Sequence, residues 1–123
     1  MQVIAQQITN RKALPKKPRL KVELASTRED VIASQKLRYQ IFAEEMGAQL
    51  TSADEGLDRD RFDEHCQHML IKDTMTGEVV GSTRILPGHM AEKTGGFYSE
   101  GEFDLSGLLP LPGRLIEVGR TCI

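Results

Sequence analysis

The stretch that decides the fold runs from residue 58 to residue 84 and reads DRDRFDEHCQHMLIKDTMTGEVVGSTR. Its first part is acidic, and a short strand is expected at Met69–Ile71. A turn over Asp73–Gly77 leads to a return strand, Glu78–Leu86, that carries Arg84 among apolar residues. Carboxylates at a strand entrance can hold an ammonium group, and a half-buried arginine can hold a carboxylate. The stretch suits a small zwitterionic ligand, with a solvated acidic loop before an ordinary hairpin as the alternative.

Composition sets the broad class of the protein. The chain has 123 residues, enough for one domain, and its 39% hydrophobic residues include no tryptophan, so a core must rely on aliphatic side chains. We find neither an apolar run of the roughly 20 residues that a membrane span needs nor a secretory signal. Two cysteines, Cys66 and Cys122, are too few for a disulfide framework. These features predict a cytoplasmic protein.

Charge divides the chain into two parts. Residues 1–19 carry five basic residues and no acid, whereas the remaining residues carry a net charge of −7. An acidic body argues against nucleic-acid binding. We expect residues 1–19 to form a basic flexible leader, with contact to the inner membrane surface or to an acidic protein as the alternative. The domain is expected at residues 20–123.

The first two elements of the domain follow from local patterns. Residues 20–25 alternate apolar and polar side chains, which predicts a half-buried strand. A capping box then starts a helix, in one of two registers: Ser26 with Glu29, or Thr27 with Asp30. Gly47 is expected to end this helix.

Charged residues interrupt the apolar face of this helix. Its core-facing arc is predicted to hold Val31, Ile41, Phe42 and Met46. Arg38 lies inside that arc, and Glu45 lies beside it two turns later. Charges that face a core must be paired or must line a site. A structural Arg38–Glu45 pair and a place in a binding site therefore both remain open.

The C-terminal third is predicted to contain a loop, a weak strand and a final strand. The loop covers residues 87–96, the weak strand 97–105, a single helical turn 105–109 and the final strand 114–122. Glu117 and Arg120 point to opposite faces of a regular strand, because their spacing is odd. A one-residue bulge near Gly119 would bring them to one face, where they could form an ion-paired floor with Arg84.

Five blocks of this sequence resemble a known family. In chain order they are LRYQIFAEEMGA (37–48), FDEHCQH (62–68), GSTRIL (81–86), FDLS (103–106) and EVGRTC (117–122). Together they resemble the ornithine N-acyltransferases of ornithine-lipid synthesis. These belong to the GNAT superfamily and are related to the acyl-homoserine-lactone synthases. The lactone synthases carry a tryptophan after the first helical region, and its absence here favours the ornithine branch.

The resemblance implies an α/β fold of the α+β kind, with a mixed twisted sheet flanked by helices. A GNAT domain also needs a phosphate-cradling glycine turn, a further helix and a further strand after the strand that carries Glu117. The sequence contains none of these before Ile123. It therefore looks like the N-terminal half of such a domain, truncated after the fourth core strand.

The resemblance also implies a reaction. The acceptor would be the α-amine of ornithine, and the donor a 3-hydroxyacyl chain held on acyl carrier protein by a phosphopantetheine thioester. No metal or redox cofactor is implied, since an amine attacks a thioester directly once a base takes its proton. An acyl-homoserine-lactone synthase is one alternative. A non-catalytic, truncated module that binds acyl carrier protein is another.

The residues that the resemblance nominates fall into two groups. Glu117 is the expected base or water-orienting group, and Arg84 with Arg120 would hold the acceptor carboxylate or form the floor of the site. Asp60 and Asp63 would bind ammonium groups. The resemblance also matches Arg38 and Phe42, and Glu45, from its place beside Arg38 on the helix, completes the expected substrate-binding set.

A metal site has little support in the sequence. His65, Cys66 and His68 lie close together in the chain, but a third ligand could come only from His89 or Cys122. We therefore expect no metal. Cys66 is also a poor candidate for a nucleophile activated by His65, since adjacent side chains on a strand point to opposite faces.

Overall fold

The structure is a computed structural model that describes residues 19–47, 49 and 55–123. The expected leader therefore lies outside the described residues except for Arg19, whose guanidinium donates to Asp73 Oδ2 at 3.1 Å. Among the described residues, no helix is both long and apolar enough to cross a membrane.

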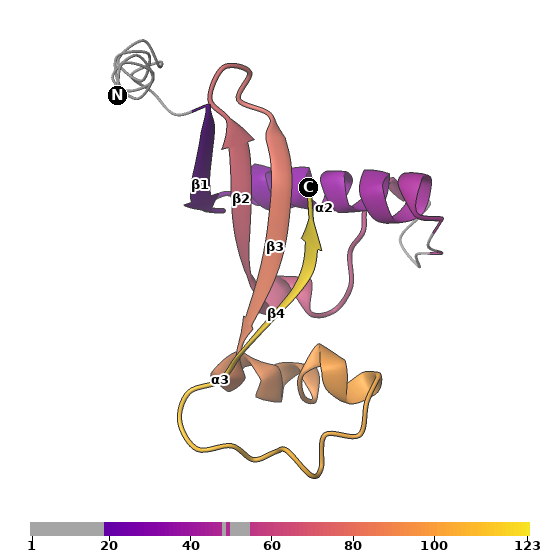
Figure 1. Cartoon of the computed structure of the whole chain (residues 1–123), viewed down its shortest axis with the longest axis vertical. Coiled ribbons are helices and arrows are strands. Elements are labelled where there is room, and N and C mark those ends of the chain that lie inside the picture. The colour runs from indigo at the N-terminus through magenta and orange to yellow at the C-terminus, as the bar shows by residue number, and fades with distance from the viewer. Residues whose placement is uncertain (1–18, 48, 50–54) are drawn as a thin grey trace, which may run out of the picture.

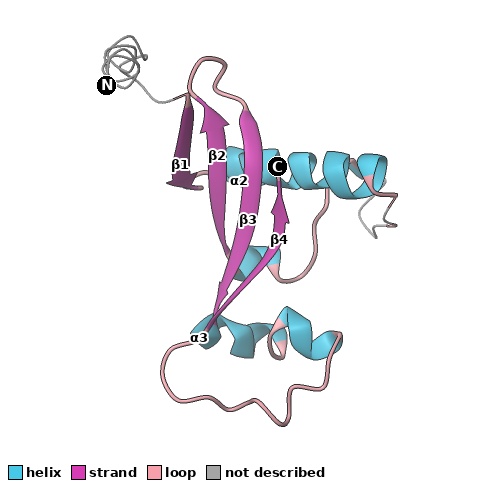
Figure 2. Ribbon diagram, viewed as in Figure 1, coloured by secondary structure: helices cyan, strands magenta, loops and turns pink. Residues whose placement is uncertain are grey.

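The elements in chain order are β1 (Leu20–Leu24), α2 (Arg28–Tyr39), the π-helix η1 (Gln40–Glu45), the 3₁₀ helix η3 (Asp63–His65), β2 (Gln67–Asp73), β3 (Val79–Pro87), α3 (Gly88–Ala91), the 3₁₀ helices η4 (Glu92–Thr94) and η5 (Tyr98–Gly101), and β4 (Ile116–Cys122) (Figure 2).

The four described strands form one antiparallel sheet in the order β1-β2-β3-β4. The predicted hairpin is confirmed as β2 and β3, although β2 begins two residues earlier than expected. Its turn is fixed by Asp73, whose side chain accepts a hydrogen bond from the Met75 amide at 2.8 Å, and by Gly77, whose φ is +75°. Helix α2 lies across one face of this sheet (Figure 1). The expected α/β architecture is therefore present.

Helix α2 starts in the second of the two predicted registers. Thr27 is the N-cap, and its hydroxyl accepts a hydrogen bond from the Asp30 amide at 3.1 Å. Lys72 on β2 then contacts both Asp30, at 3.1 Å, and Glu23 on β1, at 2.6 Å. The start of the helix is thus tied to the first two strands.

The predicted end of the helix is confirmed. The α-helix passes into the π-helix η1, and the chain then leaves it at Gly47, whose φ is +73°. The Gly47 amide donates to the Ala43 carbonyl at 3.1 Å, which closes the last turn.

The predicted direction of the core face is confirmed, but polar side chains fill its centre. The side chains that α2 buries against the sheet are Ser34, Gln35 and Arg38, all of them polar. At 100° per residue they lie within the predicted arc, whose Phe42 is half-buried and whose Met46 is 70% exposed. Polar side chains occupy this face because their partners there are charged groups of the segment before β2, as described below.

The apolar core is small and lies at the far end of the sheet. Phe62, Leu86 and Ala91 form its buried centre, and Cys66, Met90, Phe97 and Tyr98 pack against it. The expectation that β1 is half-buried is wrong within the described residues, since Leu20, Val22 and Leu24 are each at least 50% exposed. These side chains lie on the sheet face away from α2.

The segment between β3 and β4 differs from its prediction. Residues 88–94 form short helices rather than loop, and residues 98–101 form a 3₁₀ helix rather than a strand. Gly95 and Gly96 both have positive φ, +79° and +125°. They reverse the chain between the helices of residues 88–94 and 98–101, so that no strand continues through them. The expected single turn is confirmed by the hydrogen bond from the Leu109 amide to the Leu105 carbonyl at 2.8 Å. The last strand begins at Ile116, two residues later than predicted.

The N-cap assignment can be tested with neighbouring substitutions. Thr27→Ala should lower the free energy of unfolding by about 1 kcal/mol, because the Asp30 amide loses its acceptor. Ser26→Ala is the matched control and should change it by less than about 0.5 kcal/mol. Equilibrium unfolding in urea measures both. A larger loss for Ser26→Ala than for Thr27→Ala would contradict the assignment.

Candidate active site

The site is built around the acidic segment that precedes β2. The Asp58 amide donates to the Gln35 carbonyl of α2 at 3.0 Å, which holds the start of this segment against the helix. Asp60 then fixes the turn into η3, since its Oδ1 accepts from the Phe62 amide at 2.9 Å. The Asp60 amide in turn donates to Asp63 Oδ2 at 3.1 Å. The spacing D-x-D-x-x-D thus folds into a compact turn that presents three carboxylates.

Arg38 enters this turn from helix α2. Its Nη1 and Nη2 donate to the two oxygens of Asp63, each at 3.0 Å, and its Nε donates to Asp58 Oδ2 at 3.0 Å. Nη2 also donates to the Asp58 carbonyl at 2.6 Å. Arg38 is completely buried, and burial opposes its charge, but the two carboxylates raise the pKa of Arg38 above its usual value. The predicted Arg38–Glu45 pair is therefore wrong, and Glu45 is exposed at the end of η1.

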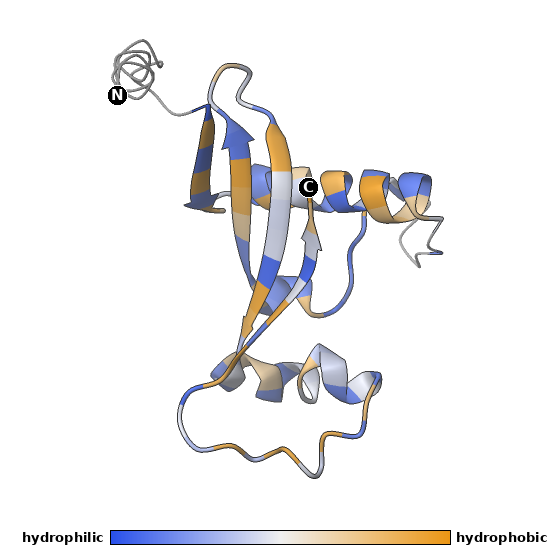
Figure 3. Cartoon of the chain, in the orientation of Figure 1, coloured by the Kyte–Doolittle hydropathy of each residue, from blue (hydrophilic) through white to orange (hydrophobic). Residues whose placement is uncertain are grey.

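Two arginines of the sheet extend this cluster. Arg84 on β3 donates through Nη1 to Asp60 Oδ1 at 2.7 Å and to Asp63 Oδ1 at 3.0 Å. Arg120 on β4 donates through Nη2 to Asp58 Oδ1 at 2.8 Å. We call these six residues, Arg38, Arg84, Arg120, Asp58, Asp60 and Asp63, the charge network. Hydrophilic segments of β3 and β4 lie at the level of the segment before β2 (Figure 3).

Asp63 stays ionised although it is buried. Burial opposes the charge of Asp63, but hydrogen bonds from Arg38 and Arg84 lower the pKa of Asp63 below its usual value. His68 lies against the same turn, and its Nε2 is 2.9 Å from the Asp63 carbonyl oxygen. Burial lowers the pKa of His68, which favours a neutral ring.

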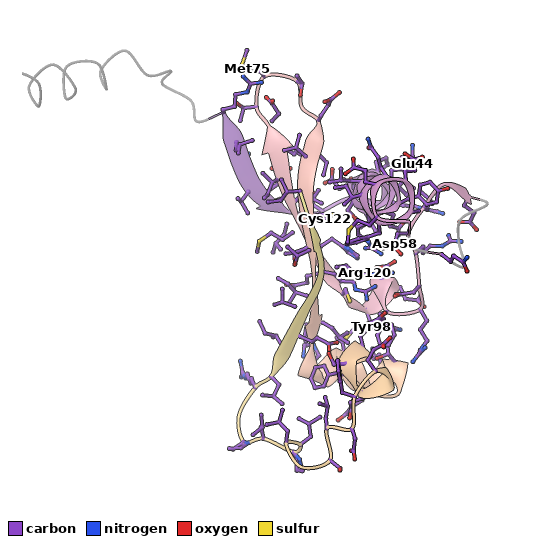
Figure 4. The ribbon with its side chains drawn as sticks, turned by 45° about the vertical axis from the view of Figure 1, so that its right-hand side comes forward. Glu44, Asp58, Met75, Tyr98, Arg120 and Cys122 are labelled. Atoms are coloured by element: carbon purple, nitrogen blue, oxygen red, sulfur yellow. The ribbon has the colours of Figure 1, made fainter. Side chains whose placement is uncertain are left out.

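The predicted bulge in the last strand is confirmed. Ser82 pairs with Cys122 and Arg84 pairs with Gly119, so β4 carries one residue more than β3 between these pairs. The left-handed residue in the bulge is Arg120, with φ of +51°, rather than a glycine. This backbone turn lets Arg120 reach Asp58, and the two side chains meet between β4 and α2 (Figure 4). The Arg120 guanidinium also lies over the Phe42 ring, 5.2 Å from its centroid.

The predicted ion-paired floor does not form, because Glu117 has other hydrogen-bond partners. Its Oε1 accepts from the Tyr98 amide at 2.7 Å, and its Oε2 accepts from the Ser99 amide at 2.9 Å and from the Ser99 hydroxyl. Both partners lie within residues 97–105, where the sequence pattern predicts a strand, so the pattern misses this contact. The Gly95-Gly96 pair is the sequence feature that could have predicted a chain reversal before Tyr98 and Ser99.

Glu117 and the two sheet arginines nevertheless share one cavity of about 100 Å³. Its lining is Phe62, Cys66, Arg84, Leu86, Tyr98, Ser99, Glu117, Val118, Gly119 and Arg120. Burial raises the pKa of the Cys66 thiol to about 11, so this cysteine is protonated at neutral pH and is a weak nucleophile. We call this space the glutamate cavity.

A second, more polar cavity of about 650 Å³ lies on the other side of Asp60. Its lining is Arg28, Val31, Gln35, Arg59, Asp60, Asp63, Glu64, Cys66 and His68. Asp60 is about one quarter exposed, whereas Asp63 is buried. We call this space the acidic cavity. The described part of the chain holds no group of three His, Cys, Asp or Glu side chains placed to bind a metal ion.

Known proteins with similar sequences are acyltransferases. The chain is 42% identical over 113 residues to an L-ornithine N(alpha)-acyltransferase of Brucella abortus and 39% identical over 113 residues to one of Rhizobium meliloti. Both alignments cover 85% of this chain, but only 40% and 38% of the relatives. The chain thus spans about 40% of the length of the curated relatives that it matches.

Solved structures with a similar fold are acyl-homoserine-lactone synthases. LasI matches with a TM-score of 0.54 and 22% identity, over 85% of this chain and 53% of LasI. TofI, solved in a ternary complex with an inhibitor and MTA, matches with a TM-score of 0.52 and 25% identity, over 85% of this chain and 56% of TofI. The acetyltransferase (GNAT) domain family matches residues 37–123. This match covers well over half of the chain and all three strands that carry or frame the two cavities, so the protein belongs to the GNAT acetyltransferase domain family.

Proposed function

We propose that the full-length protein is an N-acyltransferase that moves an acyl chain from acyl carrier protein to the α-amine of ornithine. The observation that carries this proposal is the 35–42% identity to four L-ornithine N(alpha)-acyltransferases over 83–85% of this chain. The alignments cover only 40% and 38% of the first two relatives, so the activity is proposed for the whole protein.

The reaction needs a proton acceptor beside the attacking amine. The α-amine nitrogen attacks the thioester carbonyl carbon, the new N–C bond forms and the C–S bond breaks. One proton leaves the nitrogen, and the departing thiolate takes up one. We assign the proton acceptor, direct or through a water, to Glu117. The hydrogen bonds from Tyr98 and Ser99 support this role, because they fix the carboxylate beside the glutamate cavity.

The acceptor carboxylate needs a cationic partner. Arg120 suits this role, since its buried Nε has no hydrogen-bond partner among the described residues while the side chain lines the glutamate cavity. Arg84 lines the same cavity but already pairs with two aspartates through Nη1. We therefore assign the carboxylate to Arg120 first and a supporting role to Arg84.

The side-chain ammonium of ornithine needs an anionic partner. Asp63 is a poor choice, because Arg38, Arg84, Gln35 and the Asp60 amide already donate to its oxygens. Asp60 is a better one, since its hydrogen bonds from Arg84 and from the Phe62 amide both end on Oδ1. Asp60 also lines the acidic cavity. Asp63 and Arg38 then have a structural role in the site, and the Phe42 ring packs against the Arg120 guanidinium.

The proposed activity is tested directly with the full-length protein. Incubation with 3-hydroxyacyl-loaded acyl carrier protein and ornithine should yield N-acylornithine, detected by mass spectrometry. S-adenosylmethionine in place of ornithine should yield no acyl-homoserine lactone. Lactone formation would instead favour the synthase activity, and no transfer to either acceptor would leave a binding role for acyl carrier protein.

Substitution of Glu117 tests the proton acceptor. Glu117→Gln should lower kcat by about 10²–10⁴-fold, which is the usual contribution of a general base, with KM for ornithine nearly unchanged. Glu102→Gln is the matched control, because Glu102 is exposed and lies outside both cavities. Initial rates of amide formation measure both variants. Wild-type turnover in Glu117→Gln would remove Glu117 from the mechanism.

Substitution of Asp60 tests the ammonium site. Asp60→Asn should raise KM for ornithine about 10- to 100-fold, as expected for the loss of a charge-assisted hydrogen bond. Norvaline lacks the side-chain amine, so the same substitution should leave its KM nearly unchanged. Glu78→Gln removes an exposed carboxylate that lines neither cavity and is the control. An equal rise in KM for ornithine and for norvaline would contradict the assignment.

A further inference from the structure

The strongest unassigned feature of the site is the connection between Glu117 and the segment before it in the chain. Each of the three described hydrogen bonds to the Glu117 carboxylate comes from Tyr98 or Ser99, 18 or 19 residues away. Glu117 is half-buried, and its carboxylate accepts from the first two amides of the 3₁₀ helix η5. These donors restrict both rotation and position of the carboxylate.

The donor segment is itself held rigidly. The Phe97 amide donates to the Glu100 carboxylate, and a Cβ on Gly96 would clash with that same carboxylate. The Thr94 Oγ1 lies 2.8 Å from the Gly96 carbonyl oxygen and 2.9 Å from that of Ala91, and its single proton is available to either. This contact holds the chain reversal from the other side. Residues 94–100 are thus held in this conformation by contacts that do not involve Glu117.

Tyr98 anchors this segment to the core. Its ring meets the Phe62 ring edge-on, with centroids 5.4 Å apart and an angle of 70° between planes. The Arg84 guanidinium lies 5.6 Å from the Tyr98 ring centroid. The segment that holds Glu117 is therefore in contact with the charge network, and the Tyr98 side chain lies below Arg120 (Figure 4).

The three donors divide unevenly between the two carboxylate oxygens. Oε2 accepts two hydrogen bonds, from the Ser99 amide and hydroxyl, whereas Oε1 accepts one, from the Tyr98 amide. A carboxylate oxygen has two lone-pair positions. Oε1 therefore keeps one position for a ligand in the glutamate cavity, and Ser99 occupies the other oxygen.

We propose that Ser99 is a positioning residue, whose hydroxyl holds Oε2 of Glu117 so that Oε1 faces the ligand in the glutamate cavity. The hydroxyl is the only one of the three donors that a substitution can remove without disturbing the backbone. This inference deepens the proposed function and rests on it for its catalytic part. Its structural part, the Ser99–Glu117 contact, stands independently.

The catalytic part is tested by kinetics on the full-length protein. Ser99→Ala should lower kcat about tenfold with KM for ornithine within twofold, because the carboxylate is misoriented while the ornithine-binding groups are intact. Ser99→Thr keeps the hydroxyl and should retain kcat within threefold. Ser106→Ala is the matched control, since the Ser106 hydroxyl also bonds a carboxylate, that of exposed Asp104, outside both cavities.

Two kinetic outcomes would overturn the proposal. One is an unchanged kcat in Ser99→Ala. The other is an equal fall in Ser99→Ala and Ser99→Thr, which would mean that the shape of the side chain matters and its hydroxyl does not.

A thermal unfolding cycle on the full-length protein tests the contact without any assay of activity. Ser99→Ala should lower the Tm in the wild-type background and change it much less in a Glu117→Ala background. Equal shifts in both backgrounds would overturn the proposal. If the protein fails to acylate ornithine, the proposed function fails, and the unfolding cycle alone then decides whether Ser99 positions Glu117.

Discussion

The bidentate contact between Arg38 and Asp63 is the interaction on which the other features of the site depend. It joins helix α2 to the turn before β2, and Asp63 also accepts a hydrogen bond from Arg84 in the sheet. Taking an ion out of water costs several kcal/mol, so a buried arginine is tolerable only with geometry of this quality. Loss of Asp63 would leave buried Arg38 with Asp58 as its remaining carboxylate, and loss of Arg38 would leave buried Asp63 with Arg84 as its remaining cation. Either change would remove the contact that joins the helix, the turn and β3.

The network explains why the interior between helix and sheet is polar. Ser34 and Gln35 flank Arg38 on the buried side of α2. Apart from fully buried Leu70 on β2 and Cys122 on β4, the buried apolar side chains lie at the end of the sheet around Phe62. An interior of this kind adds little to stability, but it fixes charged groups in place. The two sheet arginines are consequently oriented before any ligand arrives, and preorganised charge is the form of electrostatic stabilisation that favours acyl transfer.

Local patterns in the sequence predicted the elements but not their long-range contacts. The hairpin, the end of the helix at Gly47 and the bulge near Gly119 all follow from residue types within a few positions. The partner of Arg38 does not. Glu45 is two turns away along the same helix, about 10 Å by the helical rise, whereas Asp58 and Asp63 are brought close by the fold. The same limit hid Ser99, because Phe97 and Phe103 suggested a strand where two glycines and a 3₁₀ helix reverse the chain.

Arg120 belongs to the charge network and also has a strained backbone, with φ of +51°. A left-handed backbone at a residue with a Cβ costs roughly 1–2 kcal/mol, and glycine at this position would avoid that cost. Strained residues persist where the surroundings over-determine them, and such residues cluster at functional sites. Here Asp58 holds one nitrogen of the guanidinium, the Phe42 ring lies beneath it, and the Nε is left buried with no partner among the described residues. A carboxylate ligand that supplied an acceptor for this Nε would complete the hydrogen bonding of Arg120, in keeping with the role proposed for it.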